Sequence, residues 1–205
     1  MSRLMPLLLI ILLPLLNACG KMMGLKKLKP LPETAISETA AACSIPAADS
    51  YVLDSSSLRI LKELYAGKPT ALKDHLQPLQ AIYYSVKNSF QFPDSWQINC
   101  YAGGFPDLKW NREGRMEQFP PALQAPLDSL LSLKKRMEFL RPVTGVMPFN
   151  SISFDYIVLV YWNRFMGRQS KNLIKAVQQN VTLAGDKRVK IIYVNNDNLF
   201  SQLSR

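Results

Sequence analysis

The spacing of hydrophobic residues changes several times along this chain, and each change predicts a different kind of element. The first apolar stretch, residues 4–16, is a continuous run broken only by two prolines. Between residues 57 and 86 the apolar side chains recur every three or four positions, which is the spacing of one helix face. We therefore predict one helix from Ser57 to near Gly67 and a second from Pro69 to Val86, kinked or split at Pro78.

The middle of the chain combines a turn signal with a leucine-rich segment. A Gly-Gly pair at 103–104 lies between an alternating run at 97–101 and a shorter one at 108–110, which predicts a β-hairpin. A third helix is predicted from Pro120-Pro121 through a series of leucines that ends at residue 133. The Lys-Lys-Arg cluster at 134–136 suits the end of a helix, and we interpret it as a solvated face.

The last part of the chain has the strongest pattern. Residues 154–162 (FDYIVLVYW) form a nearly continuous apolar run, as expected for a strand covered on both faces. A helical stripe from Leu173 to Val181 follows, and residues 189–194 form a second apolar strand. This order predicts a parallel βαβ unit over residues 153–205. The expected fold class is α/β (or α+β), with a helical N-terminal half, a β-hairpin and this C-terminal βαβ unit.

Length and composition indicate one globular domain. The chain has 205 residues, of which 48% are hydrophobic and 20% charged, so it holds enough apolar material to form a core. Residues 30–50 contain three prolines and many Ala, Ser and Thr residues without clear periodicity. We therefore predict a flexible tether over residues 19–50 and a single domain over residues 51–205.

The N-terminus has the layout of a cleaved secretory signal. Arg3 supplies a basic start, and the 13 apolar residues that follow are too few to cross a bilayer, which takes about 20. The run ends in Leu16-Asn17-Ala18-Cys19, which resembles the lipobox of bacterial lipoproteins, the substrates of signal peptidase II. An ordinary secretory peptide that happens to end near a cysteine is the alternative.

The lipobox resemblance implies where in the cell the protein is located. It implies a diacylglycerol on the Cys19 sulfur, cleavage after residue 18, and a mature chain held on a membrane by acyl chains. Removing residues 1–18 removes Arg3 and no acidic residue, so the formal net charge would fall from +10 to +9. Gly20 stands where an aspartate would retain a lipoprotein at the inner membrane, which implies the outer membrane and a domain that faces the periplasm. Nucleic acid is therefore not an expected partner.

The remaining cysteines and the single histidine limit the chemistry. Cys43 and Cys100 form an even pair in an oxidising compartment, which predicts a disulfide, with two free thiols as the alternative. No Cys-x-x-Cys motif is present, and one histidine excludes histidine-rich metal sites, so neither a metal nor a cofactor is expected. His75 lies beside a helical stripe, and we interpret it as a half-buried polar residue rather than a catalyst.

The strand–helix junction from Trp162 to Lys171 (WNRFMGRQSK) resembles the active-site segment of the thioredoxin-like family. Met166 and Gln169 stand where that family has its two cysteines, Gly167 keeps its place, and Asp197 lies near the end of the second strand. The resemblance covers about 45 residues and implies a thioredoxin-like fold without redox activity, because neither a thioether nor an amide forms a mixed disulfide. The family's later strands are missing after this segment. They would be supplied by the earlier hairpin, by a partner, or not in that manner.

The same junction is the candidate ligand loop. It lies at the carboxyl end of a parallel strand, where ligands bind in open α/β sheets. Arg164 and Arg168 would hold a carboxylate or phosphate there, next to Met166 and Gln169. The alternative is that both arginines are ordinary solvent-exposed loop residues, and residues 195–197 are interpreted as turn and cap residues.

Three functions are compatible with these patterns. The first is a non-catalytic envelope lipoprotein that acts as a binding or assembly module with an envelope protein partner. The second is a degenerate thioredoxin relative that binds clients without redox chemistry. The third, an enzyme that acts on envelope polymers, ranks last because Gly-x-Ser-x-Gly, His-Glu-x-x-His and carboxylate–histidine pairs are missing from the sequence.

Overall fold

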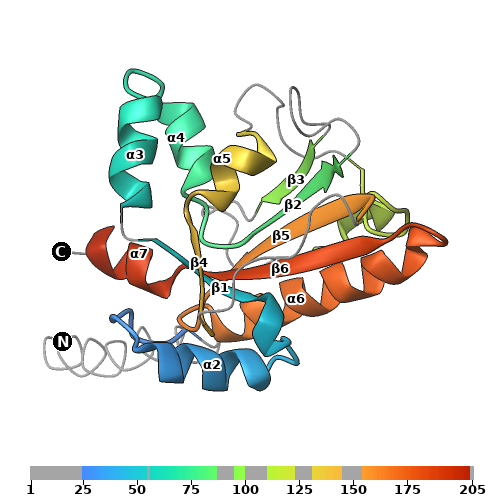
Figure 1. Ribbon diagram of the computed structural model, residues 1–205, viewed down its shortest axis with the longest axis horizontal. Coiled ribbons are helices and arrows are strands. Elements are labelled where there is room, and N and C mark those ends of the chain that lie inside the picture. Colours follow the sequence, from blue (N-terminus) through green and yellow to red (C-terminus); the bar gives the residue numbers. More distant parts are fainter. Residues whose placement is uncertain are drawn as a thin grey trace, which may run out of the picture.

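A six-stranded mixed β-sheet lies at the centre of the part of the chain that the structure describes (Figure 1). The computed structural model describes residues 25–54, 56–86, 95–99, 110–122, 131–144 and 154–203. Across the sheet the strands follow the order β3-β2-β5-β6-β1-β4. Helices cover both faces, so the predicted α/β class is confirmed.

The sheet has a parallel centre and antiparallel edges. Strand β6 pairs in parallel with β5 on one side and with β1 on the other, whereas β2, β3 and β4 join antiparallel. The predicted βαβ unit is confirmed as β5, helix α6 and β6. The strand bounds are β1 Ser50–Leu53, β2 Gln80–Ser85, β3 Ser95–Asn99, β4 Leu140–Pro142, β5 Tyr156–Trp162 and β6 Val189–Asn195.

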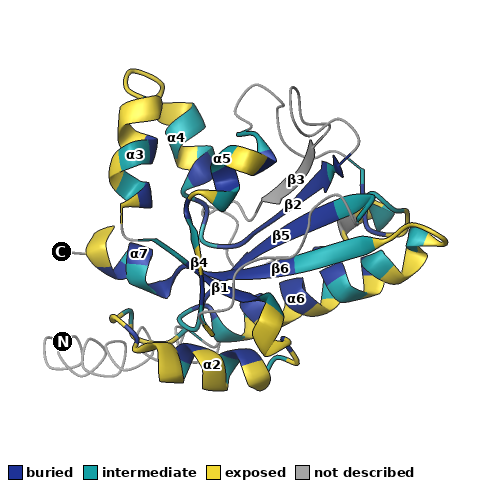
Figure 2. Cartoon of the chain, viewed as in Figure 1, coloured by how far each residue is buried: buried dark blue, intermediate teal, exposed yellow. Residues whose placement is uncertain are grey.

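The core consists of two layers because successive side chains of a strand point to opposite faces. On one face, Val158 and Val160 of β5 pack with Leu173 and Val177 of α6 (Gly167–Val181) and with helix α2 (Glu33–Ala41). On the other face, alternate residues of β5 such as Leu159 pack with helix α5 (Leu133–Met137). The middle strands are therefore buried on both sides, as Figure 2 shows.

The remaining helices are short, and local signals set their ends. Helix α3 (Ser57–Leu64) is followed by Gly67, whose φ of 75° suits glycine. Helix α4 (Pro69–His75) begins with proline, which is favourable in a first helical turn because it lacks the N–H that would be unpaired there. Helix α7 (Asp197–Leu203) follows β6 directly, and 3₁₀ turns lie at Ala47–Asp49 and Thr182–Ala184.

The second predicted helix is correct only in its first part. Helix α4 ends at His75, and β2 begins five residues later at Gln80, where a continuing helix was predicted. Ala81, Ile82, Tyr83 and Tyr84 of β2 are all fully buried between layers. Since a strand buried on both faces lacks polar–apolar alternation, its apolar residues also matched a helical spacing.

Two predictions for the middle of the chain also change. Residues 95–99 form a strand as expected, but that strand pairs with β2, and Trp110 lies in a turn with its indole buried in the core. Residues 100–109 and 123–130 lie outside the described part, so only the two ends of the third predicted helix can be compared. Residues 120–122 are not helical, and α5 begins at Leu133, where Ser132 Oγ accepts a hydrogen bond of 3.2 Å from the Lys135 N–H.

The tether predicted over residues 19–50 is wrong from Leu25 onward. Leu31, Ile36, Ala40 and Ile45 are buried in the main core, and residues 33–41 form helix α2. The composition of this segment predicted a flexible tether because only a few of its side chains are strongly apolar, and alanine is only weakly hydrophobic. The folded domain therefore begins by Leu25, whereas the predicted signal peptide and Cys19 lie outside the described residues.

Candidate functional site

Asn163 organises the junction between β5 and α6. Its side-chain amide donates to the Pro78 carbonyl at 2.8 Å and to Asn196 Oδ1 at 3.1 Å, while its Oδ1 accepts from the Met166 N–H at 2.9 Å. The Ser170 hydroxyl donates to the Asn163 carbonyl at 2.6 Å and accepts from the Asn163 N–H at 3.2 Å. Asn163 thus connects the start of α6, the end of β6 and the turn before β2.

Asp197 holds the same loop from the other side. Its carboxylate accepts the Arg164 N–H at 2.6 Å, the Phe165 N–H at 3.3 Å and the Asn195 side-chain amide at 2.8 Å. The residue is 1% exposed, and this burial raises the pKa of the carboxyl above its usual value, although the three donors oppose the rise. The carboxylate therefore acts as an acceptor that shapes the backbone of the loop.

The structure separates the four residues of the predicted ligand loop. Met166 lies in the hydrophobic core, so its side chain does not belong to a ligand surface. Arg168 is exposed, Arg164 is half-buried, and Gln169 is half-buried with no hydrogen-bond partner for its Oε1 among the described residues. Residues 195–197, predicted to be turn and cap residues, prove to be the hydrogen-bonding framework under this loop.

A second polar cluster, which the sequence did not indicate, lies between α4 and α5. Arg136 is 2% exposed, contrary to the predicted solvated face, and its Nη2 lies 2.7 Å from His75 Nδ1. A guanidinium has only donors, so Nδ1 must be the acceptor and His75 is held as the neutral tautomer with its proton on Nε2. Among the described residues no carboxylate pairs with Arg136.

Aromatic rings surround this buried cation. The Arg136 guanidinium carbon lies 5.7 Å from the centroid of the Tyr161 ring, and the Tyr65 and His75 rings are 4.5 Å apart. Burial raises the pKa of Tyr84 to about 12, and its hydroxyl donates to the Leu131 carbonyl at 3.0 Å. The ring faces partly compensate the charge, since an aromatic face attracts a cation. The cluster therefore fixes α4 and α5 to the sheet.

The N-terminal segment Leu25–Leu31, which we call the strap, connects to both the junction and α7. The Lys26 N–H donates to the Phe165 carbonyl at 2.7 Å. At the other end, Asn198 Oδ1 accepts the Leu31 N–H at 2.7 Å, and its amide donates to the Leu31 carbonyl at 3.1 Å. The strap is thereby fixed across the carboxyl end of the parallel strands.

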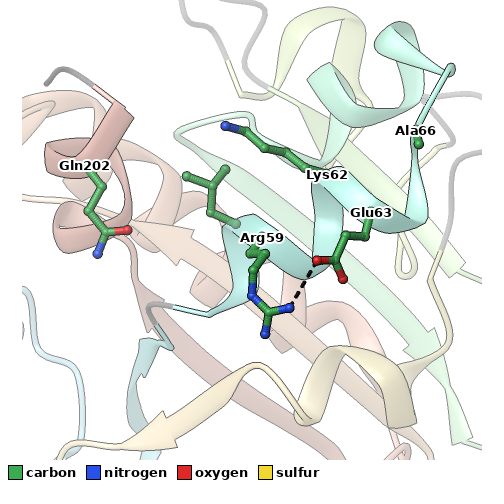
Figure 3. A pocket seen from close by; sticks show the side chains of 6 residues that line it. Arg59, Lys62, Glu63, Ala66 and Gln202 are labelled. Atoms are coloured by element: carbon green, nitrogen blue, oxygen red, sulfur yellow. Dashed lines mark hydrogen bonds and ion pairs between the residues drawn. The ribbon is translucent and has the colours of Figure 1, made fainter.

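Two surface grooves lie near this end of the sheet. One, between α3 and α7, has charged and polar side chains among its lining residues and a volume of about 530 Å³. Figure 3 shows Arg59 paired with Glu63 on its wall, opposite Gln202, and the two paired atoms are 3.0 Å apart. The other, which we call the apolar groove, also measures about 530 Å³. Side chains of the strap, α4, the junction and α7 line it, namely Leu28, Leu72, Leu76, Phe165 and Phe200.

The chemistry of the described residues is limited in two further respects. They contain no group of three or more His, Cys, Asp or Glu side chains placed to hold a metal ion. Cys43 is half-buried and free, and burial raises the pKa of its thiol. Because Cys100 lies outside the described part, the disulfide between the two stays a prediction.

Comparison with known proteins identifies no relative of this chain, so its function has to be inferred from its own residues. No family model, no curated protein and no solved structure matches this chain. Within residues 25–203, gaps excepted, none of the helices combines the length and the apolar character needed to cross a bilayer.

Proposed function

We propose that this protein is a lipid-anchored protein of the bacterial cell envelope whose α/β domain serves as a non-catalytic binding or assembly module. The observation that carries the proposal is the Leu16-Asn17-Ala18-Cys19 motif at the end of a short apolar run with a basic start. Acyl chains on Cys19 would hold the mature chain on the periplasmic side of the outer membrane.

The geometry at the strand ends supports a binding role over catalysis. The polar side chains there, Asn163, Asn196 and Asp197, bond to one another's segments and to backbone groups, and so hold a surface in a fixed shape. The Nδ1 atom of the single histidine is occupied by Arg136. A rigid domain of this kind, without a free catalytic side chain among these residues, suits a module that binds a partner protein in the envelope through another of its surfaces.

A specific observation favours a second candidate, a thioredoxin-like client-binding domain without redox activity. Strands β2 and β3 lie antiparallel beside β5, and they precede the βαβ unit in the chain. This arrangement supports completion of the sheet by strands that come earlier in the chain, one of the alternatives that the resemblance leaves open. Met166 and Gln169 at the cysteine positions cannot exchange disulfides, so the candidate is restricted to binding.

The mass of the mature N-terminus tests the anchor. We expect the natural chain to begin at Cys19 and to carry the mass of a diacylglycerol, with or without an additional acyl group. A Cys19→Ser variant is the matched control, and it should keep residues 1–18 and lose the lipid mass. A mature chain without lipid that begins beyond residue 19 would contradict the proposal.

Two assays distinguish the candidates for the domain. An insulin-reduction assay should give no turnover above the rate with dithiothreitol alone, and clear turnover would rule out both binding candidates. Pull-down of the lipidated chain from solubilised envelopes should recover a protein at a fixed ratio. Recovery of bound glycan without protein would favour the polymer-acting alternative.

A further inference from the structure

The apolar groove is bounded by the segment that leads to the lipid site. Leu28 of the strap forms one wall, and Phe165, whose carbonyl binds the strap, forms another. The Phe165 and Phe200 rings lie 5.7 Å apart along the groove. All three side chains are half-buried, so apolar surface here remains accessible next to a fixed point of the chain.

The length of chain between this fixed point and Cys19 is short. Only residues 20–24 separate Cys19 from Leu25, and a peptide spans at most about 3.5 Å per residue. The Cys19 sulfur therefore lies within roughly 25 Å of the strap whatever path the chain takes. A lipid on Cys19 would therefore keep the carboxyl end of the parallel strands close to the membrane surface.

The charge around the groove suits the same surface. The strap, Lys68 and helix α4 together contain five lysines and one carboxylate, the half-buried Asp74. Lys26, Lys27, Lys29, Lys68 and Lys73 are all exposed. Bacterial envelopes contain anionic lipids, and lysines beside a membrane anchor are attracted to their headgroups.

We propose that the apolar groove is a membrane contact, in which acyl chains of an anionic bilayer occupy the space between the strap and α4 while the lysines meet the headgroups. The inference rests on the proposed lipid anchor at Cys19, and it extends that proposal from attachment to orientation. The domain then lies with α4, α7 and the loop at 163–170 against the bilayer, and it presents the far end of α6 to the periplasm.

Photocrosslinking in the cell envelope tests this contact. The full-length chain is produced with p-benzoylphenylalanine in place of Phe200 or Leu72, since this residue inserts into nearby C–H bonds under light. The control position is Leu183, a 50% exposed leucine that follows α6. Because α6 has 15 residues and is therefore about 22 Å long, Leu183 lies far from the loop at 163–170.

We expect the intact mass of irradiated protein to increase by one phospholipid at Phe200 and Leu72, with a yield several-fold above that at Leu183. Phe200 is the conservative site, because one aromatic side chain replaces another and folding is preserved. Equal yields at all three positions would overturn the inference. Adducts with a protein mass at the groove would also overturn it, since the groove would then be a protein interface.

Charge reversal provides an independent measurement. Lys27→Glu with Lys29→Glu should lower the lipid adduct at Phe200 several-fold, whereas Lys175→Glu with Lys187→Glu, an equal change on exposed lysines elsewhere, should leave it unchanged. The same mass spectra report the N-terminus. A lipidated chain without groove adducts contradicts the membrane contact alone, whereas an unlipidated chain contradicts both the anchor and the contact.

Discussion

At the scale of single residues, the buried polar side chains hold segments of the chain in place. Asn163 and Asp197 hold the loop between β5 and α6, and Arg136 with His75 holds α5 to α4. A buried polar group is costly when it lacks a partner, so each member of these clusters depends on the others. Arg164 and Arg168, which were expected to bind a ligand, are more exposed than Asn163 and Asp197, which support their loop.

Replacing Arg136 should reveal this dependence. Arg136→Ala removes a fully buried side chain and leaves His75 Nδ1 without its donor, so the free energy of unfolding should fall by about 3 kcal/mol. Arg136→Met keeps most of the volume and should lose about 1 kcal/mol. Lys134→Ala, an exposed neighbour on the same helix, should change stability by less than about 0.5 kcal/mol in denaturant unfolding. Equal losses for all three variants would contradict the buried cluster.

The raised pKa of Asp197 gives a second prediction, on pH. In the folded state the carboxyl binds its proton more tightly than in the unfolded state, so its contribution to stability is full below the unfolded pKa and is lost as pH rises through the folded pKa. The difference in unfolding free energy between the natural chain and Asp197→Asn should therefore widen as pH falls from 7 toward 4. This is measurable by urea unfolding at several pH values.

Asp54 is the matched control for this measurement. Hydrogen bonds from the Ser56 hydroxyl and backbone N–H lower the pKa of Asp54, which is the opposite direction. Its contribution is present above the unfolded pKa and is lost on acidification, so the difference for Asp54→Asn should narrow as pH falls. If both variants showed the same trend, the assigned causes of the two shifts would be wrong.

At the scale of elements, the strap is the least expected component. It has no helix or strand of its own, and two hydrogen bonds from Asn198 fix its end. The side chain of Asn198 mimics a strand neighbour, since it accepts from and donates to the same residue, Leu31. The strap therefore depends on α7, which is far from it in sequence.

Removing that side chain should release the strap. Asn198→Ala should lower the free energy of unfolding by about 2 kcal/mol, because the buried Leu31 N–H and carbonyl lose their partners. It should also speed trypsin cleavage after Lys27, whose surroundings become accessible when the strap detaches. Gln202→Ala, at an exposed position on the same helix, should do neither. Unchanged cleavage in Asn198→Ala would show that other contacts hold the strap.

Comparing the predicted with the observed helices and strands shows which of them the sequence alone could identify. The run at 154–162 and the stripe at 173–181 predicted β5 and α6 correctly, because a buried strand and an amphipathic helix leave long, distinct patterns. Strand β2 was predicted as a helix, because its packing against β3 and β5 decides its form and that packing is not local. The contact between His75 and Arg136 joins residues 61 positions apart, so a single sequence could not indicate it.

At the scale of the whole molecule, β6 is the strand on which the sheet depends. It pairs with β5 and β1, whereas β4 reaches the sheet only through β1. Amide hydrogen exchange should therefore be slowest in peptides from 156–162 and 189–195, where opening requires global unfolding, and much faster in the edge strand at 140–142. Equal protection of β4 and β6 would contradict this hierarchy.

The place of β6 in the chain order has a consequence for the timing of folding. Strand β1 is complete at Leu53, but its parallel neighbour begins only at Val189, so the ribosome adds well over a hundred residues between them. At about 10 residues per second this interval lasts on the order of 10 s, during which β1 has no central neighbour to join. The edge formed by β1 and β4 can therefore join the rest of the sheet only after Val189–Asn195 has been synthesised, so closure of the sheet is one of the last steps of folding.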